Sequence, residues 1–203
     1  MKPLHRQFVR TARRHPRRFA MADAQNKKVT FGAALAKTIF LARRLEKIWA
    51  GQEMVGIFLP PGVPGALVNH AAMLCGKVPV NLNYTLSEAA LASCAQQCGI
   101  KTVVTSRTFL EKIKLSVPCE AVFLEDLAAK PMFVEKLAAF LMAKFLPVSL
   151  IERALGNCRR RPVSYTHLLC LPARTPAHRL FAPLRSPRQT GRPPRKPPPK
   201  CRP

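Results

Sequence analysis

Glycine is scarce in this chain, and the few glycines are mostly isolated from one another. The 203-residue sequence contains nine of them. A loop that wraps a nucleotide triphosphate needs clustered Gly, Ser and Thr together with a lysine, because backbone amides and a cation must neutralise the phosphate charge. The chain contains no such cluster. No residue can therefore be assigned to triphosphate binding by motif.

Acidic residues are absent from the last part of the chain. Residues 158–203 hold 12 Lys or Arg and 11 Pro but no Asp or Glu, so the net charge of +24 divides into +12 for this tail and +12 for residues 1–157. A tail of this composition cannot bury enough apolar surface to offset its ordering entropy. We expect it to be disordered and rich in polyproline II.

The junction with this tail has an unusual sequence. Residues 159–168 read Arg-Arg-Arg-Pro-Val-Ser-Tyr-Thr-His-Leu and resemble a translated sequencing adapter. This resemblance predicts that residues 158–203 are foreign to the gene. The alternative is a non-enzymatic basic protein whose Lys and Arg side chains bind nucleic acid or an anionic membrane.

Two further absences concern the compartment. The seven cysteines are odd in number and form no regular spacing, so reduced thiols are expected. Residues 1–19 contain no continuous apolar segment of the kind found in a signal peptide. We therefore expect a cytoplasmic protein, with peripheral contact to the inner membrane as a further possibility to test.

Apolar and polar residues alternate in a way that predicts repeated strand and helix units. Strands are expected at residues 28–31, 54–59, 77–82, 102–105 and 121–124. Helices are expected at residues 35–49, 63–75, 86–98 and 107–113, with Gly51 and Gly99 ending two of them. Thr85 and Glu88 have the spacing of a capping box. The pattern favours a largely parallel sheet covered by helices.

Residues 132–155 form the most apolar helical segment. Val134, Leu137, Leu141 and Phe145 make one stripe, and Pro147 interrupts the segment. About 15 uninterrupted residues reach only roughly 22 Å, which is too short to cross a bilayer. Two interpretations remain: a helix buried under a larger domain, or an interfacial helix with Lys136, Lys144 and Arg153 facing phospholipid headgroups.

Three stretches carry a family resemblance. Residues 76–85 read Gly-Lys-Val-Pro-Val-Asn-Leu-Asn-Tyr-Thr, residues 101–107 read Lys-Thr-Val-Val-Thr-Ser-Arg, and residues 109–112 read Phe-Leu-Glu-Lys. They resemble the early part of AMP-forming acyl ligases, in particular the synthetase half of bacterial bifunctional acyl-acyl-carrier-protein synthetase/2-acylglycerophosphoethanolamine acyltransferases. The resemblance implies a basic lead-in helix at 1–20 and a truncated N-terminal part of the ligase domain at 21–157.

The resemblance also implies a reaction for an intact relative. Fatty acid and ATP would give acyl-adenylate and pyrophosphate with the help of Mg²⁺, and the acyl group would pass to acyl carrier protein or coenzyme A for phospholipid acylation. The motifs for this chemistry are missing here. The acyltransferase motif His-x4-Asp is missing as well, because the positions five residues before Asp23 and Asp126 are Arg18 and Ala121. The chain alone is predicted to be inactive, with no catalytic, cofactor-binding or metal-binding residue and no nucleic-acid partner.

Four further groups of residues have side chains that could form a metal, catalytic or ligand site. Cys94 and Cys98 could ligate a metal, and His70 with Cys75 could be a base and nucleophile, but packed core positions are favoured for both pairs. Asn81, Asn83 and Tyr84 follow a strand where ligands bind in open sheets, although an Asn turn is favoured.

The N-terminal arginines form the fourth group. They could bind phosphate, but a solvated helix with Leu4, Phe8 and Ala12 as its apolar stripe is favoured; the basic residues are Arg10, Arg13, Arg14, His15, Arg17 and Arg18.

Overall fold

A computed structural model describes residues 3–23, 28–129 and 133–157. All described residues belong to one compact unit. The predicted disorder and foreign origin of residues 158–203 concern positions outside the described residues.

A four-stranded parallel sheet lies at the centre of the described unit. Its order is β4-β3-β5-β6, with the strands at Met54–Ile57 (β3), Val78–Asn81 (β4), Thr102–Thr105 (β5) and Glu120–Phe123 (β6). All three strand pairs are parallel. The chain therefore runs outward from β3 to β4, crosses back over β3 to β5, and continues to β6.

Alternating side chains of β5 enter two different hydrophobic cores. Val104 packs with Val55 and Ile57 on one face of the sheet, whereas Val103 packs with Phe58 on the other face. This alternation follows from the two-residue period of a strand. All four residues of β5 are buried, as expected for a strand covered by helices on both faces.

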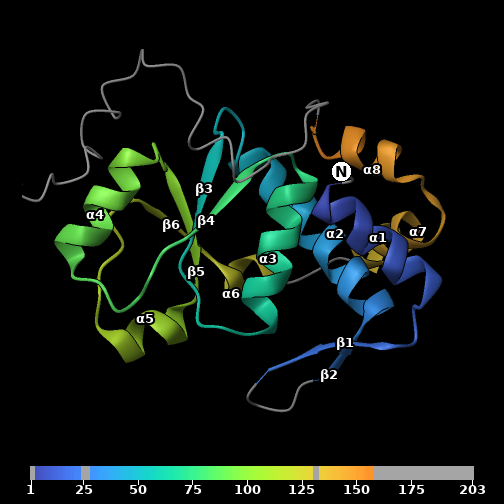
Figure 1. Ribbon diagram of the computed structural model, residues 1–203, viewed down its shortest axis with the longest axis horizontal. Coiled ribbons are helices and arrows are strands. Elements are labelled where there is room, and N and C mark those ends of the chain that lie inside the picture. Colours follow the sequence, from blue (N-terminus) through green and yellow to red (C-terminus); the bar gives the residue numbers. More distant parts are fainter. Residues whose placement is uncertain (1–2, 24–27, 130–132, 158–203) are drawn as a thin grey trace, which may run out of the picture. The chain divides into compact units, whose positions relative to one another are not determined.

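Helices cover both faces of the sheet, as Figure 1 shows. The α4 helix (Glu88–Gln97) and the α5 helix (Arg107–Ile113) lie on one side. The α2 helix (Phe31–Ile48) and the α3 helix (Val63–Leu74) lie on the other side. The predicted fold class, a largely parallel sheet covered by helices, is confirmed.

The N-terminal helix α1 (Leu4–Arg14) is part of the larger core. Phe8, Val9 and Ala12 are buried, but Leu4 is 58% exposed. The predicted stripe was therefore wrong at Leu4, because the helix face that packs inward includes Val9 in its place. A short antiparallel pair follows, β1 (Phe19–Ala22) with β2 (Lys28–Thr30), and the sequence did not predict β1.

The predicted capping box at Thr85 and Glu88 is wrong. The α4 helix begins later, with Ser87 as the N-cap, and the Ser87 hydroxyl accepts a hydrogen bond from the Ala90 amide. Thr85 instead donates its amide and hydroxyl to the Asn83 side chain. Glu88 accepts from the amide and hydroxyl of Ser116, so neither member of the predicted box caps the helix.

Three helices complete the described chain: α6 (Leu124–Ala128), α7 (Phe133–Phe145) and α8 (Val148–Ala154). Pro147 separates α7 from α8, as predicted. The buried residues of α7 are Ala139 and Ala143, and Met142 packs partly buried against the same core. The other large apolar side chains of α7 are exposed. Among the described residues, no helix combines the length and the apolar character that a membrane crossing requires.

Candidate functional site

The carboxyl edge of the parallel sheet is the place where this topology puts a ligand site. The connection from β3 leads to one side and the connection from β5 leads to the other, so the strand order reverses between these two strands. Open α/β sheets bind ligands in the crevice at such a switch point. At this point the Thr105 hydroxyl donates to the Phe58 carbonyl at 2.9 Å and the Phe58 amide donates to the Val104 carbonyl at 2.9 Å, so these groups are already bonded within the sheet.

The asparagines at the end of β4 are engaged with other side chains. Asn81 and Asn69 donate to each other's side-chain oxygen at 3.0 Å, and Asn69 also donates to the Gly65 carbonyl. Asn83 accepts from Thr85 and forms the predicted turn. The predicted turn role is therefore confirmed for Asn83, whereas Asn81 joins β4 to α3.

Aromatic rings lie beside these asparagines. Tyr84 lies edge-on to Phe109, with ring centroids 5.7 Å apart, and Phe109 makes the same kind of contact with Phe58. Tyr84 is 38% exposed. These contacts give Tyr84 a packing role between the β4 end and α5.

Polar side chains at the ends of β5 and β6 bind each other. Ser106 donates its hydroxyl and Arg107 donates its backbone amide to one oxygen of Glu125, at 2.7 and 3.1 Å. The guanidinium of Arg107 donates two parallel hydrogen bonds to Asp126, at 2.8 and 2.7 Å. Sequence reasoning assigned no role to Glu125 and Asp126. Their position could have indicated a role, since Glu125 and Asp126 follow β6 as Ser106 and Arg107 follow β5, and adjacent parallel strands end at the same edge of a sheet.

Two carboxyl groups of this cluster are held ionised. Burial acts to raise the pKa of Glu125, but hydrogen bonds from Ser106 and from backbone amides including that of Arg107 lower it overall. The hydrogen bond from Arg107 lowers the pKa of Asp126. The arginine is thus neutralised by carboxylates of this same chain, which leaves little positive charge at this edge for a phosphate.

His70 in α3 and Cys75 at the C-cap of α3 both occupy packed positions, against α1 and α2 respectively. The His70 ring stacks on Phe8, with centroids 4.1 Å apart and planes 11° from parallel. Burial, together with the charge of His5, lowers the pKa of His70. Burial raises the pKa of the Cys75 thiol to about 12, and its sulfur lies 3.6 Å from the Ala42 carbonyl. A thiol with this pKa is protonated at neutral pH and is a poor nucleophile.

The cysteines on α4 are also free thiols. Cys94 and Cys98 are partly buried, and burial raises the pKa of Cys98. Within residues 3–23, 28–129 and 133–157, no group of three or more His, Cys, Asp or Glu side chains could hold a metal ion.

The N-terminal arginines divide into solvated and structural ones. Arg10, Arg14, Arg17 and Arg18 are exposed. Arg13 is partly buried and donates to the carbonyls of Met142, Ala143 and Leu146 at the end of α7. The solvated-helix interpretation is right for Arg10 and Arg14, whereas Arg17 and Arg18 lie in the turn that follows α1. Arg13 caps a neighbouring helix.

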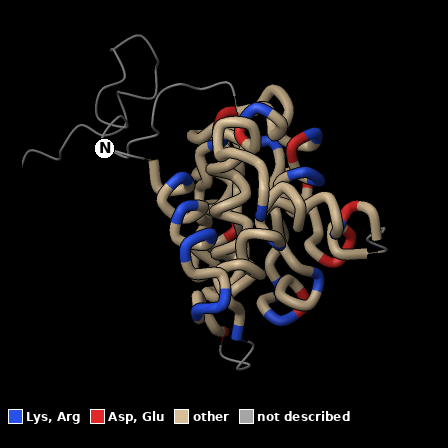
Figure 2. Tube along the Cα trace, turned by 90° about the vertical axis from the view of Figure 1, so that its right-hand side faces the viewer, with Lys and Arg blue, Asp and Glu red and all other residues tan. Residues whose placement is uncertain are grey.

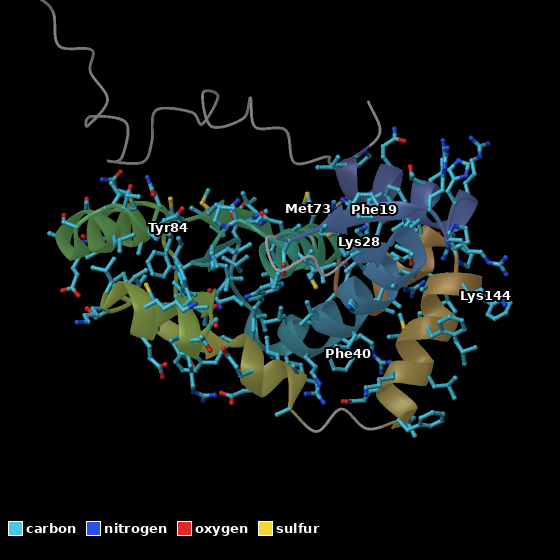
Figure 3. The ribbon with its side chains drawn as sticks, turned by 90° about the horizontal axis from the view of Figure 1, so that it is seen from below. Phe19, Lys28, Phe40, Met73, Tyr84 and Lys144 are labelled. Atoms are coloured by element: carbon cyan, nitrogen blue, oxygen red, sulfur yellow. The ribbon has the colours of Figure 1, made fainter. Side chains whose placement is uncertain are left out.

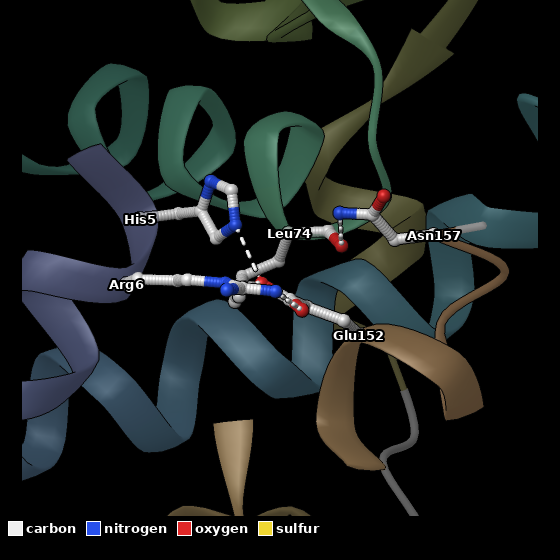
Figure 4. A network of polar contacts seen from close by, with 5 residues as sticks. All are labelled: His5, Arg6, Leu74, Glu152 and Asn157. Atoms are coloured by element: carbon white, nitrogen blue, oxygen red, sulfur yellow. Dashed lines mark hydrogen bonds and ion pairs between the residues drawn. The ribbon is translucent and has the colours of Figure 1, made fainter. Parts of the chain in front are cut away.

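A polar network joins α1 to α8, as Figure 4 shows. Arg6 donates to both oxygens of Glu152 at 2.6 Å, and His5 Nε2 lies 2.8 Å from one of them. Asn157 donates to the Leu74 carbonyl at the end of α3. These contacts hold the two ends of the described chain against each other.

An open groove of about 520 Å³ lies beside β6. It is bordered by α2, β6, α6 and α7, and its charged lining residues are Arg43, Arg44, Lys47, Asp126 and Glu135. Within the described residues, β6 is an edge strand with one unpaired side. An unpaired strand edge can accept a further strand.

Comparisons with known proteins identify the fold and the family. Solved structures with this fold include the N-terminal subdomain of NpsA from Klebsiella oxytoca, with a TM-score of 0.56, 16% identity, and coverage of 65% of this chain and 33% of that chain. O-succinylbenzoate coenzyme A synthetase (MenE) from Bacillus subtilis, solved in complex with AMP, has a TM-score of 0.54 and 22% identity, and the match covers 64% of this chain and 33% of that chain. The N-terminal domain of FACL13 from Mycobacterium tuberculosis has a TM-score of 0.53 and 20% identity, and the match covers 63% of this chain and 35% of that chain.

This chain therefore spans only about a third of the length of these three solved chains. A family model described as AMP-binding enzyme matches residues 8–147, which is more than half of the chain. The chain belongs to the AMP-binding enzyme family.

Proposed function

We propose that this chain forms the first subdomain of an AMP-forming ligase that activates fatty acids. In the proposed intact enzyme, a fatty acid carboxylate attacks the α-phosphorus of ATP, giving acyl-adenylate and releasing pyrophosphate. The thiol of acyl carrier protein then takes the acyl group and releases AMP. The observation that carries the proposal is the family match over residues 8–147, together with the acyl-ligase resemblance of residues 76–112.

The substrate class rests on that resemblance. The solved structures with this fold are named for more varied substrates and ligands. One is named as O-succinylbenzoate coenzyme A synthetase, and another, VinN, was solved in complex with L-aspartate. Fatty acid as substrate, acyl carrier protein as acceptor, and a link to phospholipid acylation are therefore parts of the proposal.

ATP and Mg²⁺ do not fit the residues described here. The polar groups at the carboxyl edge, namely Asn81, Ser106 and Arg107, are bound to Asn69, Glu125 and Asp126. A triphosphate would have to displace an ion pair and would meet two carboxylates. We therefore assign no step of nucleotide chemistry to these side chains. Their proposed role is to brace the loops of the sheet edge against each other.

In this proposal the structural contribution of the chain is a pre-formed sheet edge. Further strands of the intact enzyme would pair with the open side of β6, and the groove beside β6 would receive them. The nucleotide-binding residues would then come from segments beyond β6.

A chimaeric enzyme tests the proposal. Residues 8–147 would replace the matching segment of a fatty acyl-acyl-carrier-protein synthetase from the same family. We expect long-chain fatty acid to stimulate ATP–pyrophosphate exchange and acyl transfer to carrier protein. The matched control carries Val103→Asp, which buries a charge in the sheet and should abolish both. A soluble, folded chimaera with no more exchange than this control would contradict the proposal.

A further inference from the structure

The α7 helix packs inward through Ala139, Ala143 and the partly buried Met142, and it exposes its other large apolar side chains. Ala139 and Ala143 face inward, towards α1 and α2. Phe133 is 78% exposed and Phe145 is 64% exposed, and four more large apolar side chains of α7 are at least 42% exposed: Val134, Leu137, Phe140 and Leu141. We call these six residues the outer face of α7. Large exposed apolar side chains gathered on one helix face in this way are typical of an interaction site.

The acidic side chains of α7 and α8 are bound to arginines of other helices. Glu135 of α7 forms an ion pair with Arg44 of α2. Glu152 of α8 is buried against Arg6 and His5. The charged residues that are exposed on these two helices are Lys136, Lys144 and Arg153. Glu135 keeps 37% of its side chain exposed, but its charge is neutralised by Arg44.

Lys144 has a position that favours lipid over protein as the partner. At 100° per residue it lies in the middle of the outer face of α7, between Phe140 and Leu137, and its ammonium group is 5.2 Å from the centroid of the Phe145 ring. Figure 3 shows Lys144 at the outer side of α7. At a protein interface this ammonium would need an acidic partner, whereas in a bilayer its long side chain can reach the headgroups.

The neighbouring helix adds positive charge. The α1 helix lies against α7 through Arg13, and it exposes Arg10 and Arg14. Figure 2 shows Lys and Arg recurring along the trace on this side of the described unit. Cationic residues around an apolar helix face are the features of a helix that lies in an anionic membrane surface.

We propose that α7 lies in the surface of an anionic phospholipid bilayer, with its outer face in the acyl boundary and Lys136, Lys144 and Arg153 at lipid phosphates. The helix has 13 residues, too few to span a bilayer. This contact does not depend on the proposed ligase activity. It would place the chain at the surface where fatty acids partition.

The direct test measures insertion with the full 203-residue chain. Phe140→Trp places a fluorophore on the outer face of α7, and Phe19→Trp places one on an equally exposed site of β1. Vesicles of phosphatidylcholine and phosphatidylglycerol would carry brominated acyl chains. We expect bromine quenching and a blue shift for tryptophan at position 140 and neither at position 19. Equal behaviour at both positions would overturn the proposal.

Two matched pairs of variants separate the apolar and the electrostatic contribution. Leu137→Gln with Leu141→Gln and Phe145→Gln should lower vesicle partitioning by about tenfold or more, since each large apolar side chain contributes roughly 1.5–3 kcal/mol when buried. Phe19→Gln with Leu4→Gln should change it little, because both residues lie outside the outer face. Lys136→Glu with Lys144→Glu should weaken binding more than Lys28→Glu with Lys37→Glu, which alters the net charge equally.

These pairs also control for the basic tail. Residues 158–203 carry 12 Lys or Arg in every variant, so vesicle binding that depended on the tail alone would be unchanged by all four sets of substitutions. That result would overturn the proposal. A dimer of the unmodified chain that dissociates in the triple Gln variant, without bromine quenching at position 140, would overturn it in favour of a second copy as the partner.

Discussion

At the scale of single residues, Glu152 is the side chain of the Arg6–His5–Glu152 network whose substitution should lower the free energy of unfolding most. Glu152→Gln would leave Arg6 and His5 without a charged partner at a site where the Glu152 side chain is only 8% exposed. Hydrogen bonds to charged groups contribute about 1.5–3 kcal/mol. Because the Arg6 side chain is 49% exposed, we expect a loss near the lower end, about 1–2 kcal/mol, in urea unfolding. Asp126→Asn, in an exposed ion pair, is the control and should cost less.

The same carboxyl group gives a pH dependence. Burial alone would raise the pKa of Glu152, but hydrogen bonds from Arg6 and His5 outweigh it and hold the pKa below the ordinary 4.5. A carboxyl with a depressed folded-state pKa stabilises the fold above its unfolded-state pKa, and this contribution is lost as pH falls through the folded-state value. The free energy of unfolding should therefore fall below pH 4.5. The decline should be smaller in Glu152→Gln; an unchanged decline would assign it to other carboxyl groups.

Gly56 is a residue whose size is fixed by its neighbours. A Cβ atom at this position in β3 would lie 2.7 Å from Val103 Cγ2 and 3.1 Å from Ile100 Cγ2. Val103 is β-branched and cannot move easily. We expect Gly56→Ala to lower the free energy of unfolding by about 1–3 kcal/mol, the usual cost of an overfilled core. Adding Val103→Ala should recover part of the loss in the same urea titration, and an additive double variant would contradict this geometry.

At the scale of elements, the sequence was informative where periodicity and burial agree. The strand β5 was predicted to its ends and β3 to within two residues. For β3 the reason is a nearly continuous apolar run that Pro60 stops, and for β5 it is a short run of β-branched residues. Gly51 was predicted as a helix end, and its φ of +71° explains why glycine is suited there. The start of α4 was wrong because Thr85 had two possible partners, and the nearer one, Asn83, takes its hydrogen bonds.

The candidate site was less predictable than the strands. Ser106 follows β5 and Glu125 lies in α6 directly after β6, so their hydrogen bond depends on the register of β5 and β6. Periodicity gives the face of a strand but not the partner of a side chain at its end. The outward stripe of α7 shows the same limit: the spacing of Leu137 and Leu141 predicted one apolar face, but not whether that face lies inside or outside.

The orientation of α7 gives a stability prediction. Leu137→Gln with Leu141→Gln and Phe145→Gln should change the free energy of unfolding by less than about 1 kcal/mol, because glutamine is a good helix former and these positions are exposed. The soluble yield should rise as the exposed apolar surface shrinks. Ala143→Gln places the same side chain at a buried position and should cost about 1–3 kcal/mol. A triple variant less stable than Ala143→Gln would show that the stripe is packed inside.

At the scale of the whole molecule, the central claim is that the chain supplies the scaffold of an adenylate-forming ligase and not its nucleotide site. At the sheet edge where a ligand would lie, Thr105 is hydrogen-bonded to Phe58, and the charged residues Arg107 and Asp126 neutralise each other. The family match therefore identifies the fold, while the chemistry is proposed to come from segments beyond β6.

ATP–pyrophosphate exchange with a long-chain fatty acid tests this claim most directly. The full chain would be assayed under conditions in which the protein is folded, as shown by a cooperative unfolding transition. The chimaera that contains residues 8–147 would serve as the positive control. We predict no exchange by the chain alone above a sample without protein, and clear exchange by the chimaera. Exchange by the chain alone that depends on both ATP and fatty acid would contradict the claim, since it would require a nucleotide site within this sequence.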